Sequence, residues 1–150
     1  MIRPILVTFG MLLVYAGCAL PRFTILTDSL SPEEHLELGI AYEKKGEFDN
    51  AIQEYTAAAK KYPVAVFYLG NAHFQKNEWD KAEKYYKKAI RKEGHNADAH
   101  NNLAWLYYVR GKNLDEAESL VLRAMELSPS QSDTYKDTLE KIRELKNSLR

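Results

Sequence analysis

The strongest constraint on this chain of 150 residues is a pattern of small and apolar residues that occurs three times between residues 32 and 129. Each copy has a leucine and a small residue, then an alanine, a larger apolar residue, a second alanine and a turn residue. The copies are Leu38-Gly39 with Ala51, Tyr55, Ala58 and Pro63; Leu69-Gly70 with Ala82, Tyr86, Ala89 and Gly94; and Leu103-Ala104 with Ala117, Val121, Ala124 and Pro129. Because one such unit cannot bury its apolar face alone, the copies have to stack around a shared core.

The spacing places two helices in each copy, joined by a tight turn. We expect helices near residues 32–45, 48–61, 64–76, 79–92, 97–110, 114–127 and 132–148. Ser31 and Glu34 predict a capping box at the first helix, and Asn113 and Ser130, each with an acidic residue three positions later, predict similar starts. The last helix is amphipathic, as expected of a helix that caps the stack. Its apolar face carries Tyr135, Leu139, Ile142, Leu145 and Leu149.

This pattern resembles the tetratricopeptide repeat (TPR), in which a Leu-Gly-x-x-Tyr segment, an Ala-x-x-x-Phe segment and a proline recur with a period of about 34 residues. Here Gly39 and Gly70 lie 31 residues apart, and Gly70 and Ala104 lie 34 apart, so the turns differ in length. The resemblance implies an all-α solenoid with three TPR repeats over residues 32–129 and a C-terminal capping helix over residues 130–150.

The first 17 residues differ in character from the rest of the chain. Arg3 supplies one positive charge, and a largely apolar stretch of twelve residues runs from Ile5 to Ala16. A helix that spans a bilayer needs about 20 apolar residues, so this stretch better matches the apolar region of a signal peptide. We therefore expect residues 1–17 to be an export signal.

Tyr15-Ala16-Gly17-Cys18 resembles the lipobox of bacterial lipoproteins, although tyrosine stands where leucine is usual. The resemblance implies cleavage before Cys18, acylation of this cysteine with fatty acids such as palmitate, and a tether over residues 18–31. Ala19 follows in place of the aspartate that would indicate inner-membrane retention. This favours a lipid anchor on the periplasmic side of the bacterial outer membrane. Two alternatives remain open: an ordinary secretory signal that is cleaved nearby, and an uncleaved anchor helix.

Charge and motif content narrow the function. Lys+Arg and Asp+Glu both number 21, and a net charge of zero argues against nucleic acid as a main partner. The single cysteine cannot form an intramolecular disulfide. We find no nucleophile motif, phosphate-binding loop or metal-ligand pattern, so we expect no catalytic residue, no metal and no cofactor, and we interpret the chain as a non-enzyme. His35, His73 and His100 fall at packing positions of the repeat.

In TPR proteins the first helix of each repeat lines a concave surface on which ligands bind. Carried onto this chain, the expected partner-binding residues are Leu36, Ile40, Phe67, Asn71, Phe74, Asn101, Trp105 and Tyr108. Glu43, Val64 and Asp98 should face the same side. Some family members hold a C-terminal carboxylate with Lys, Arg and Asn at such positions; only the asparagines match here, so we expect an apolar and aromatic groove. The alternative is that neighbouring first helices bury these side chains against one another, or that the last helix folds across them. For Leu36 and Val64 this alternative is as plausible as binding.

These features together predict a membrane-tethered scaffold. It would bind a protein or peptide segment of another envelope protein in its groove during assembly of a larger complex. The alternative is an accessory subunit of a secreted peptidase or exporter, which presents its partner at the membrane. Fold alone cannot choose between these roles, because repeat modules of this kind serve many systems.

Overall fold

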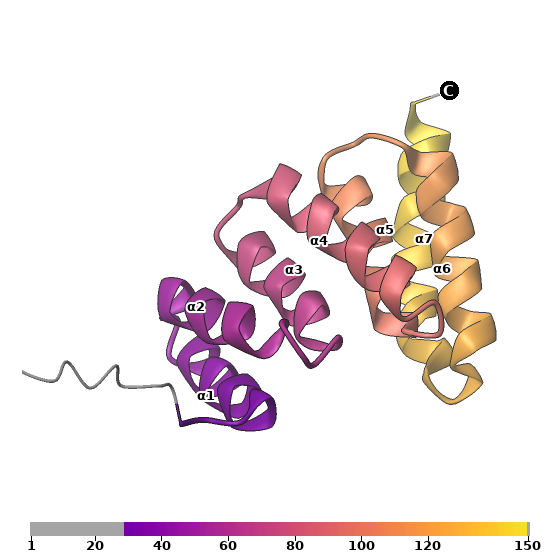
Figure 1. Cartoon of the computed structure of the whole chain (residues 1–150). Helices are drawn as coiled ribbons and strands as arrows, with labels where there is room; N and C mark the ends of the chain where they lie inside the picture. The colour runs from indigo at the N-terminus through magenta and orange to yellow at the C-terminus, as the bar shows by residue number, and fades with distance from the viewer. Residues whose placement is uncertain (1–28, 150) are drawn as a thin grey trace, which may run out of the picture.

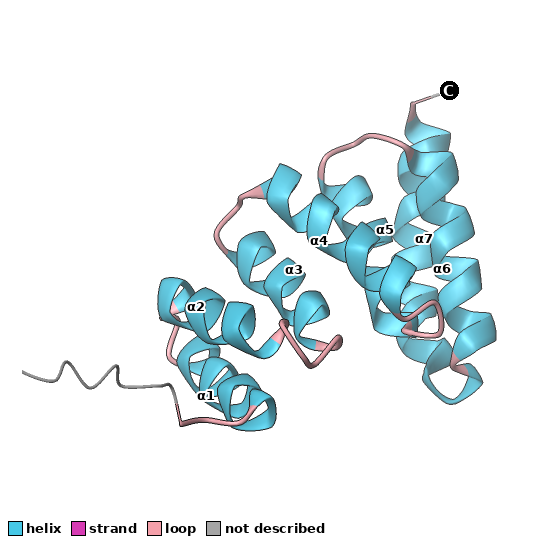
Figure 2. Ribbon diagram, viewed as in Figure 1, coloured by secondary structure: helices cyan, strands magenta, loops and turns pink. Residues whose placement is uncertain are grey.

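The computed structural model describes residues 29–149, and over those residues it consists of helices joined by short turns (Figures 1 and 2). The elements are α1 (Pro32–Lys44), α2 (Phe48–Ala58), α3 (Ala65–Gln75), α4 (Trp79–Lys92), α5 (Ala97–Val109), α6 (Leu114–Leu127), the 3-10 turn η1 (Pro129–Gln131) and α7 (Ser132–Ser148). Each helix agrees with its expected range to within three residues. The all-α class, with paired helices and a final capping helix, is confirmed.

The expected signal peptide, Cys18 and most of the tether precede residue 29 and lie outside the described residues. Within residues 29–149, no helix combines the length and the apolar character that a membrane span requires.

One of the three predicted helix caps is confirmed. The Ser31 hydroxyl accepts a hydrogen bond from the Glu34 amide at 3.1 Å, and the Ser31 amide donates to the Glu34 carboxylate at 2.6 Å. The caps at Asn113 and Ser130 are wrong: neither side chain caps a helix, because Asn113 has a left-handed backbone (φ 52°) and Ser130 lies inside η1. Asn96 instead caps α5, accepting from the Ala99 amide at 2.9 Å.

The turn inside each repeat needs a residue with a left-handed backbone. Gly46, Asn77 and Gly111 occupy this position, with φ of 76°, 58° and 60°. Glycine adopts this region without steric cost, and asparagine tolerates it better than most residues. The third turn has one residue more than the others, and Asn113 there adopts a second positive φ, which accommodates the longer connection.

A small residue on the first helix lets a large residue on the second helix approach closely. A Cβ built on Gly39 would lie 2.4 Å from the Tyr55 ring, and one on Gly70 would lie 2.5 Å from the Tyr86 ring. Real Cβ atoms do not approach other atoms this closely, so any larger residue would force the tyrosine ring or the helix to shift. In the third repeat the equivalent positions hold Ala104 and Val121, both fully buried, where a larger first residue is matched by a smaller second one.

The helices pack in sequence order, and α7 covers the C-terminal end of the stack. Figure 1 shows α7 (yellow) running beside α6. Tyr135, Leu139 and Ile142 on α7 are buried in the core cluster shared with α5 and α6. On the rim, Glu118 of α6 accepts hydrogen bonds from Arg143 at 2.7 Å and Lys146 at 2.6 Å. The expected role of this helix as a cap is therefore visible in its contacts.

Candidate binding groove

Two adjoining hollows lie along the first helices of the repeats. The first has a volume of about 220 Å³ and is lined by Glu43, Asn71, Phe74, Gln75, Tyr86, Asn102 and Trp105. The second has a volume of about 430 Å³ and is lined by Ile40, Glu43, Lys44, Phe48, Tyr68 and Gln75. Because Glu43 and Gln75 line both hollows, the two form one continuous surface across α1, α3 and α5, which we call the groove.

A hydrogen-bond network fixes the floor of the first hollow. The Tyr86 hydroxyl donates to Asn71 Oδ1 at 2.9 Å, and the Asn102 side-chain amide donates to the same oxygen at 3.0 Å. Burial raises the pKa of Tyr86; the hydrogen bond with Asn102 lowers it, and the nearby charge of Glu43 raises it further. With its oxygen occupied twice, Asn71 presents its N–H groups to a ligand, and these groups donate to carbonyl oxygens.

Glu43 is held by the equivalent tyrosine of the first repeat. The Tyr55 hydroxyl donates to Glu43 Oε2 at 2.5 Å. Burial raises the pKa of Tyr55, and the hydrogen bond to this carboxylate raises it further. Both tyrosines thus have a ring in the core, against a glycine, and a hydroxyl that reaches a polar side chain of the groove.

The aromatic residues of the groove contact other side chains of the protein. The Trp105 ring lies 4.9 Å from the Tyr108 ring, centroid to centroid, and Lys141 Nζ of α7 lies 5.2 Å from the Trp105 centroid. The Phe74 ring lies edge-on to Trp79 with centroids 5.2 Å apart. These contacts hold Trp105 and Phe74 in place before a ligand arrives, which reduces the entropy lost on binding.

The structure separates the eight expected partner-binding residues into two groups. Asn71, Phe74 and Trp105 line the first hollow, and Ile40 lines the second. The other four line neither hollow: Leu36, Phe67, Asn101 and Tyr108.

The second group is engaged in helix packing. Leu36 packs on the core of the first repeat, and the Phe67 ring lies 5.4 Å from Tyr68 and 6.3 Å from Tyr86. The Oδ1 atom of Asn101 is buried, and its amide is 3.5 Å from Asn102 Oδ1. Tyr108 packs against the core cluster shared by α4 to α7. Ile40 and Phe74 also pack against the core and still line the hollows, so a role in binding for the second group stays a prediction.

Sequence reasoning did not place six of the lining residues on this surface: Lys44, Phe48, Tyr68, Gln75, Tyr86 and Asn102. Tyr68 and Asn102 are 34 residues apart and occupy the same position of the second and third repeats, one residue before the repeated leucine. The equivalent residue of the first repeat is Glu37, which lines neither hollow, so the repeat position alone does not mark a lining residue. Glu43 was expected to face this side, and it lines both hollows.

The buried histidines serve helix contacts. His35 Nδ1 lies 2.7 Å from Glu54 Oε2, His73 Nδ1 lies 2.6 Å from Glu78 Oε2, and His100 Nδ1 lies 2.9 Å from the Asn96 carbonyl oxygen. Hydrogen bonds from His73 and then Lys81 lower the pKa of Glu78 to about 2. Within the described residues no group of three or more His, Cys, Asp or Glu is arranged to hold a metal.

Paired helices, stacked in order and carrying a groove along their first members, define a helical-repeat interaction module. A family model of the tetratricopeptide repeat matches residues 36–93 and, in a second overlapping match, residues 69–132. The chain belongs to the tetratricopeptide repeat family, as its sequence pattern indicated.

Similar proteins come from several settings. Over 131 residues the chain is 28% identical to human protein O-mannosyl-transferase TMTC2, covering 73% of this chain and 16% of that protein. The fold is similar to the first TPR of Spaghetti (RPAP3) bound to the HSP90 peptide SRMEEVD, with a TM-score of 0.69, 25% identity, and 80% and 96% of the two chains covered. It is also similar to the Yersinia enterocolitica chaperone SycD in complex with a YopD peptide, with a TM-score of 0.67, 20% identity, and 76% and 93% covered.

Proposed function

We propose that this chain is a protein-interaction scaffold whose groove holds a segment of another protein. The observation that carries the proposal is the groove itself, in which Trp105 and Phe74 lie beside the fixed amide of Asn71. Aromatic side chains contribute much of the energy at protein interfaces, and amide donors match the carbonyl groups of a peptide. The similar RPAP3 domain was solved with a bound peptide, which supports this type of ligand.

The test of the groove is the substitution Trp105→Ala. We expect it to weaken binding of the native partner by about 2 kcal/mol, as for an interface hot spot. The partner is captured by crosslinking in cells and quantified by mass spectrometry. The matched control is Leu122→Ala, which removes an exposed apolar side chain (41% exposed) on α6, outside the groove.

Helix content and melting temperature must be retained in both variants. Unfolding of Trp105→Ala would identify Trp105 as a core residue. Full binding by a folded Trp105→Ala would place the partner on another face, and the groove model would be abandoned.

The proposed setting is the bacterial envelope, with the scaffold anchored by a lipid on Cys18 at the periplasmic side, on the outer membrane in preference to the inner. The support is the Ala16-Gly17-Cys18 sequence after an apolar stretch. Two acyl chains give a stable anchor, since each buried methylene contributes about 0.8 kcal/mol. In this setting the bound segment belongs to another envelope protein during assembly of a larger complex.

Intact-protein mass spectrometry tests the anchor. We expect a mature chain that begins at Cys18 and carries acyl groups, and we expect Cys18→Ser to leave the membrane fraction or to remain uncleaved. A mature N-terminus elsewhere, without lipid, would rule out the anchor while leaving the groove proposal intact.

A further inference from the structure

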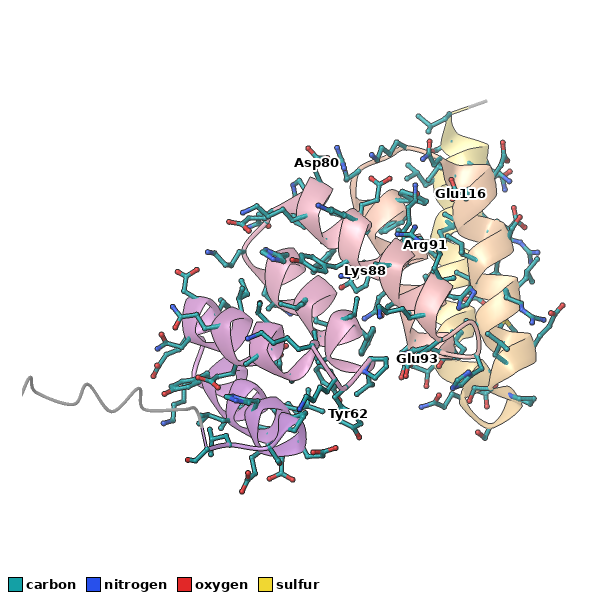
Figure 3. All side chains as sticks on the ribbon, viewed as in Figure 1. Tyr62, Asp80, Lys88, Arg91, Glu93 and Glu116 are labelled. Atoms are coloured by element: carbon teal, nitrogen blue, oxygen red, sulfur yellow. The ribbon has the colours of Figure 1, made fainter. Side chains whose placement is uncertain are left out.

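The groove has a negative charge at its centre. Glu43 is half-buried and lines both hollows, and its Oε2 accepts the Tyr55 hydroxyl. Four other half-buried glutamates each lie within ion-pair distance of a basic side chain: Glu54 of His35, Glu78 of His73 and Lys81, Glu83 of Lys87 and Lys112, and Glu118 of Arg143 and Lys146. A fifth, Glu93 (labelled in Figure 3), has no ion pair within the described part of the chain but lines neither hollow. No Lys, Arg or His of residues 29–149 forms an ion pair with Glu43.

The nearest cation in the sequence does not supply that charge. Lys44 follows Glu43 on α1 and lines only the second hollow. Neighbouring residues on a helix point about 100° apart and do not face each other. Lys44 is also exposed to solvent, where an isolated charge interacts weakly across water.

Glu43 is rigidly placed. Its partner Tyr55 is fully buried, with its ring against the backbone of Gly39, one helical turn from Glu43. The hydroxyl therefore cannot move away without disturbing the contact between α1 and α2. A carboxylate that is fixed before binding loses little entropy when a ligand pairs with it.

Covering this carboxylate is unfavourable unless the ligand brings a positive charge. A ligand that buries Glu43 without a positive charge loses the hydration of an ion and gains nothing in return. A ligand that brings a lysine or arginine forms a charge-assisted hydrogen bond and stacks its methylene stem on Tyr68 and Phe48, which line the same hollow.

We propose that the groove selects an extended peptide segment whose lysine or arginine lies at Glu43, with apolar side chains in the hollow beside Trp105. This inference rests on the proposed function. The N–H groups of Asn71 require free carbonyl oxygens, which an extended backbone offers and a helix does not. The site therefore has the opposite charge preference to one that holds a C-terminal carboxylate.

The experiment is a selection of random octapeptides displayed on phage against the full-length protein in detergent, run in parallel on Glu43→Gln, Trp105→Ala and Glu37→Gln. Glu37 is exposed on the same helix and lines neither hollow, so its variant is the matched control. We expect peptides selected by the wild type, but not by Trp105→Ala, to carry a lysine or arginine next to apolar residues.

The affinity of the best peptide is then measured by fluorescence anisotropy. Replacing its lysine with norleucine, or its arginine with citrulline, should weaken binding to the wild type about tenfold, the usual size of a charged hydrogen bond. The same replacement should have little effect on binding to Glu43→Gln, whereas Glu37→Gln should behave as the wild type.

The outcomes separate this inference from the function on which it rests. Peptides that depend on Trp105 but lack basic residues would overturn the charge preference and leave the groove intact. A failure to select any peptide that depends on Trp105 would overturn the groove itself. Basic peptides that bind Glu43→Gln at full strength would show that a general attraction to the acidic face of α1 is responsible. If Glu43→Gln does not fold, the peptide-side replacement on the wild type still decides the matter.

Discussion

At the scale of single residues, glycine is needed for two different reasons: close packing at Gly70 and backbone conformation at Gly46. Gly70→Ala should destabilise the protein by about 1–3 kcal/mol, because the added Cβ would lie 2.5 Å from the buried Tyr86 ring. Urea unfolding measures the change. The control is Gly94→Ala, whose Cβ would meet only the Ile90 carbonyl oxygen, at 3.7 Å. Equal stability of the two variants would mean that Tyr86 can move, and that the glycine is not needed for packing.

Gly46 is needed for its backbone and not for space. An added Cβ there would meet nothing within 4 Å, but φ is 76°. Gly46→Ala should therefore cost about 1–2 kcal/mol, the penalty for an L-residue in the left-handed region. The melting temperature measures this cost, and the Gly94→Ala control shows the effect of adding a methyl group where the backbone is not left-handed. A neutral Gly46→Ala would show that the turn adopts another conformation without loss.

At the scale of elements, Glu83 joins α4 to the turn before α6. It accepts hydrogen bonds from Lys112 at 2.9 Å, Lys87 at 3.0 Å and Arg110 at 3.4 Å. Burial raises the pKa of Glu83, but the hydrogen bonds from Lys112 and Lys87 outweigh burial and lower it to about 2. Because the pKa is lower in the folded state, ionised Glu83 stabilises the fold above pH 4.5, the ordinary value, and this contribution is lost as the pH falls towards 2.

The variant Glu83→Gln should accordingly melt at a lower temperature than the wild type at pH 7. The difference should narrow as the pH falls from 4.5 towards 2. Differential scanning calorimetry across this range measures it, with Glu37→Gln, at an exposed site, as the control. A difference in melting temperature that stays constant with pH would show that Glu83 stabilises the fold through packing and not through its charge.

The helices were predictable from the sequence because the same pattern occurs three times, so a segment that is ambiguous in one repeat is clear in another. Their boundaries were less so: the expected caps at Asn113 and Ser130 failed because capping depends on the backbone angles of the turn, which the residue type does not determine. Four of the eight residues expected from the sequence to bind a partner line the hollows: Ile40, Asn71, Phe74 and Trp105. One residue on a helix is a rotation of about 100°, so Asn101 was chosen where Asn102 lines the hollow.

At the scale of the whole molecule, one apolar cluster runs from α4 to α7, so the capping helix is part of the core. Ile142→Ala, at a fully buried site, should destabilise the protein by about 2–5 kcal/mol. Leu149→Ala removes an apolar side chain that is 67% exposed and should be nearly neutral. In Ile142→Ala, backbone amides of α5 and α6 should be the first to lose protection from hydrogen exchange, since repeats transmit stability to their neighbours. Unchanged protection there would mean that α7 folds independently of the stack.

The arrangement of aromatic rings gives the molecule an optical property. The chain has two tryptophans. Trp105 lines the first hollow under Lys141, and Trp79 touches Phe74 of the same hollow. A ligand that displaces the ammonium group or excludes water from these indoles changes their emission. The unlabelled protein therefore reports occupancy of its own groove through its intrinsic fluorescence, and the two indoles can be told apart by replacing either with phenylalanine.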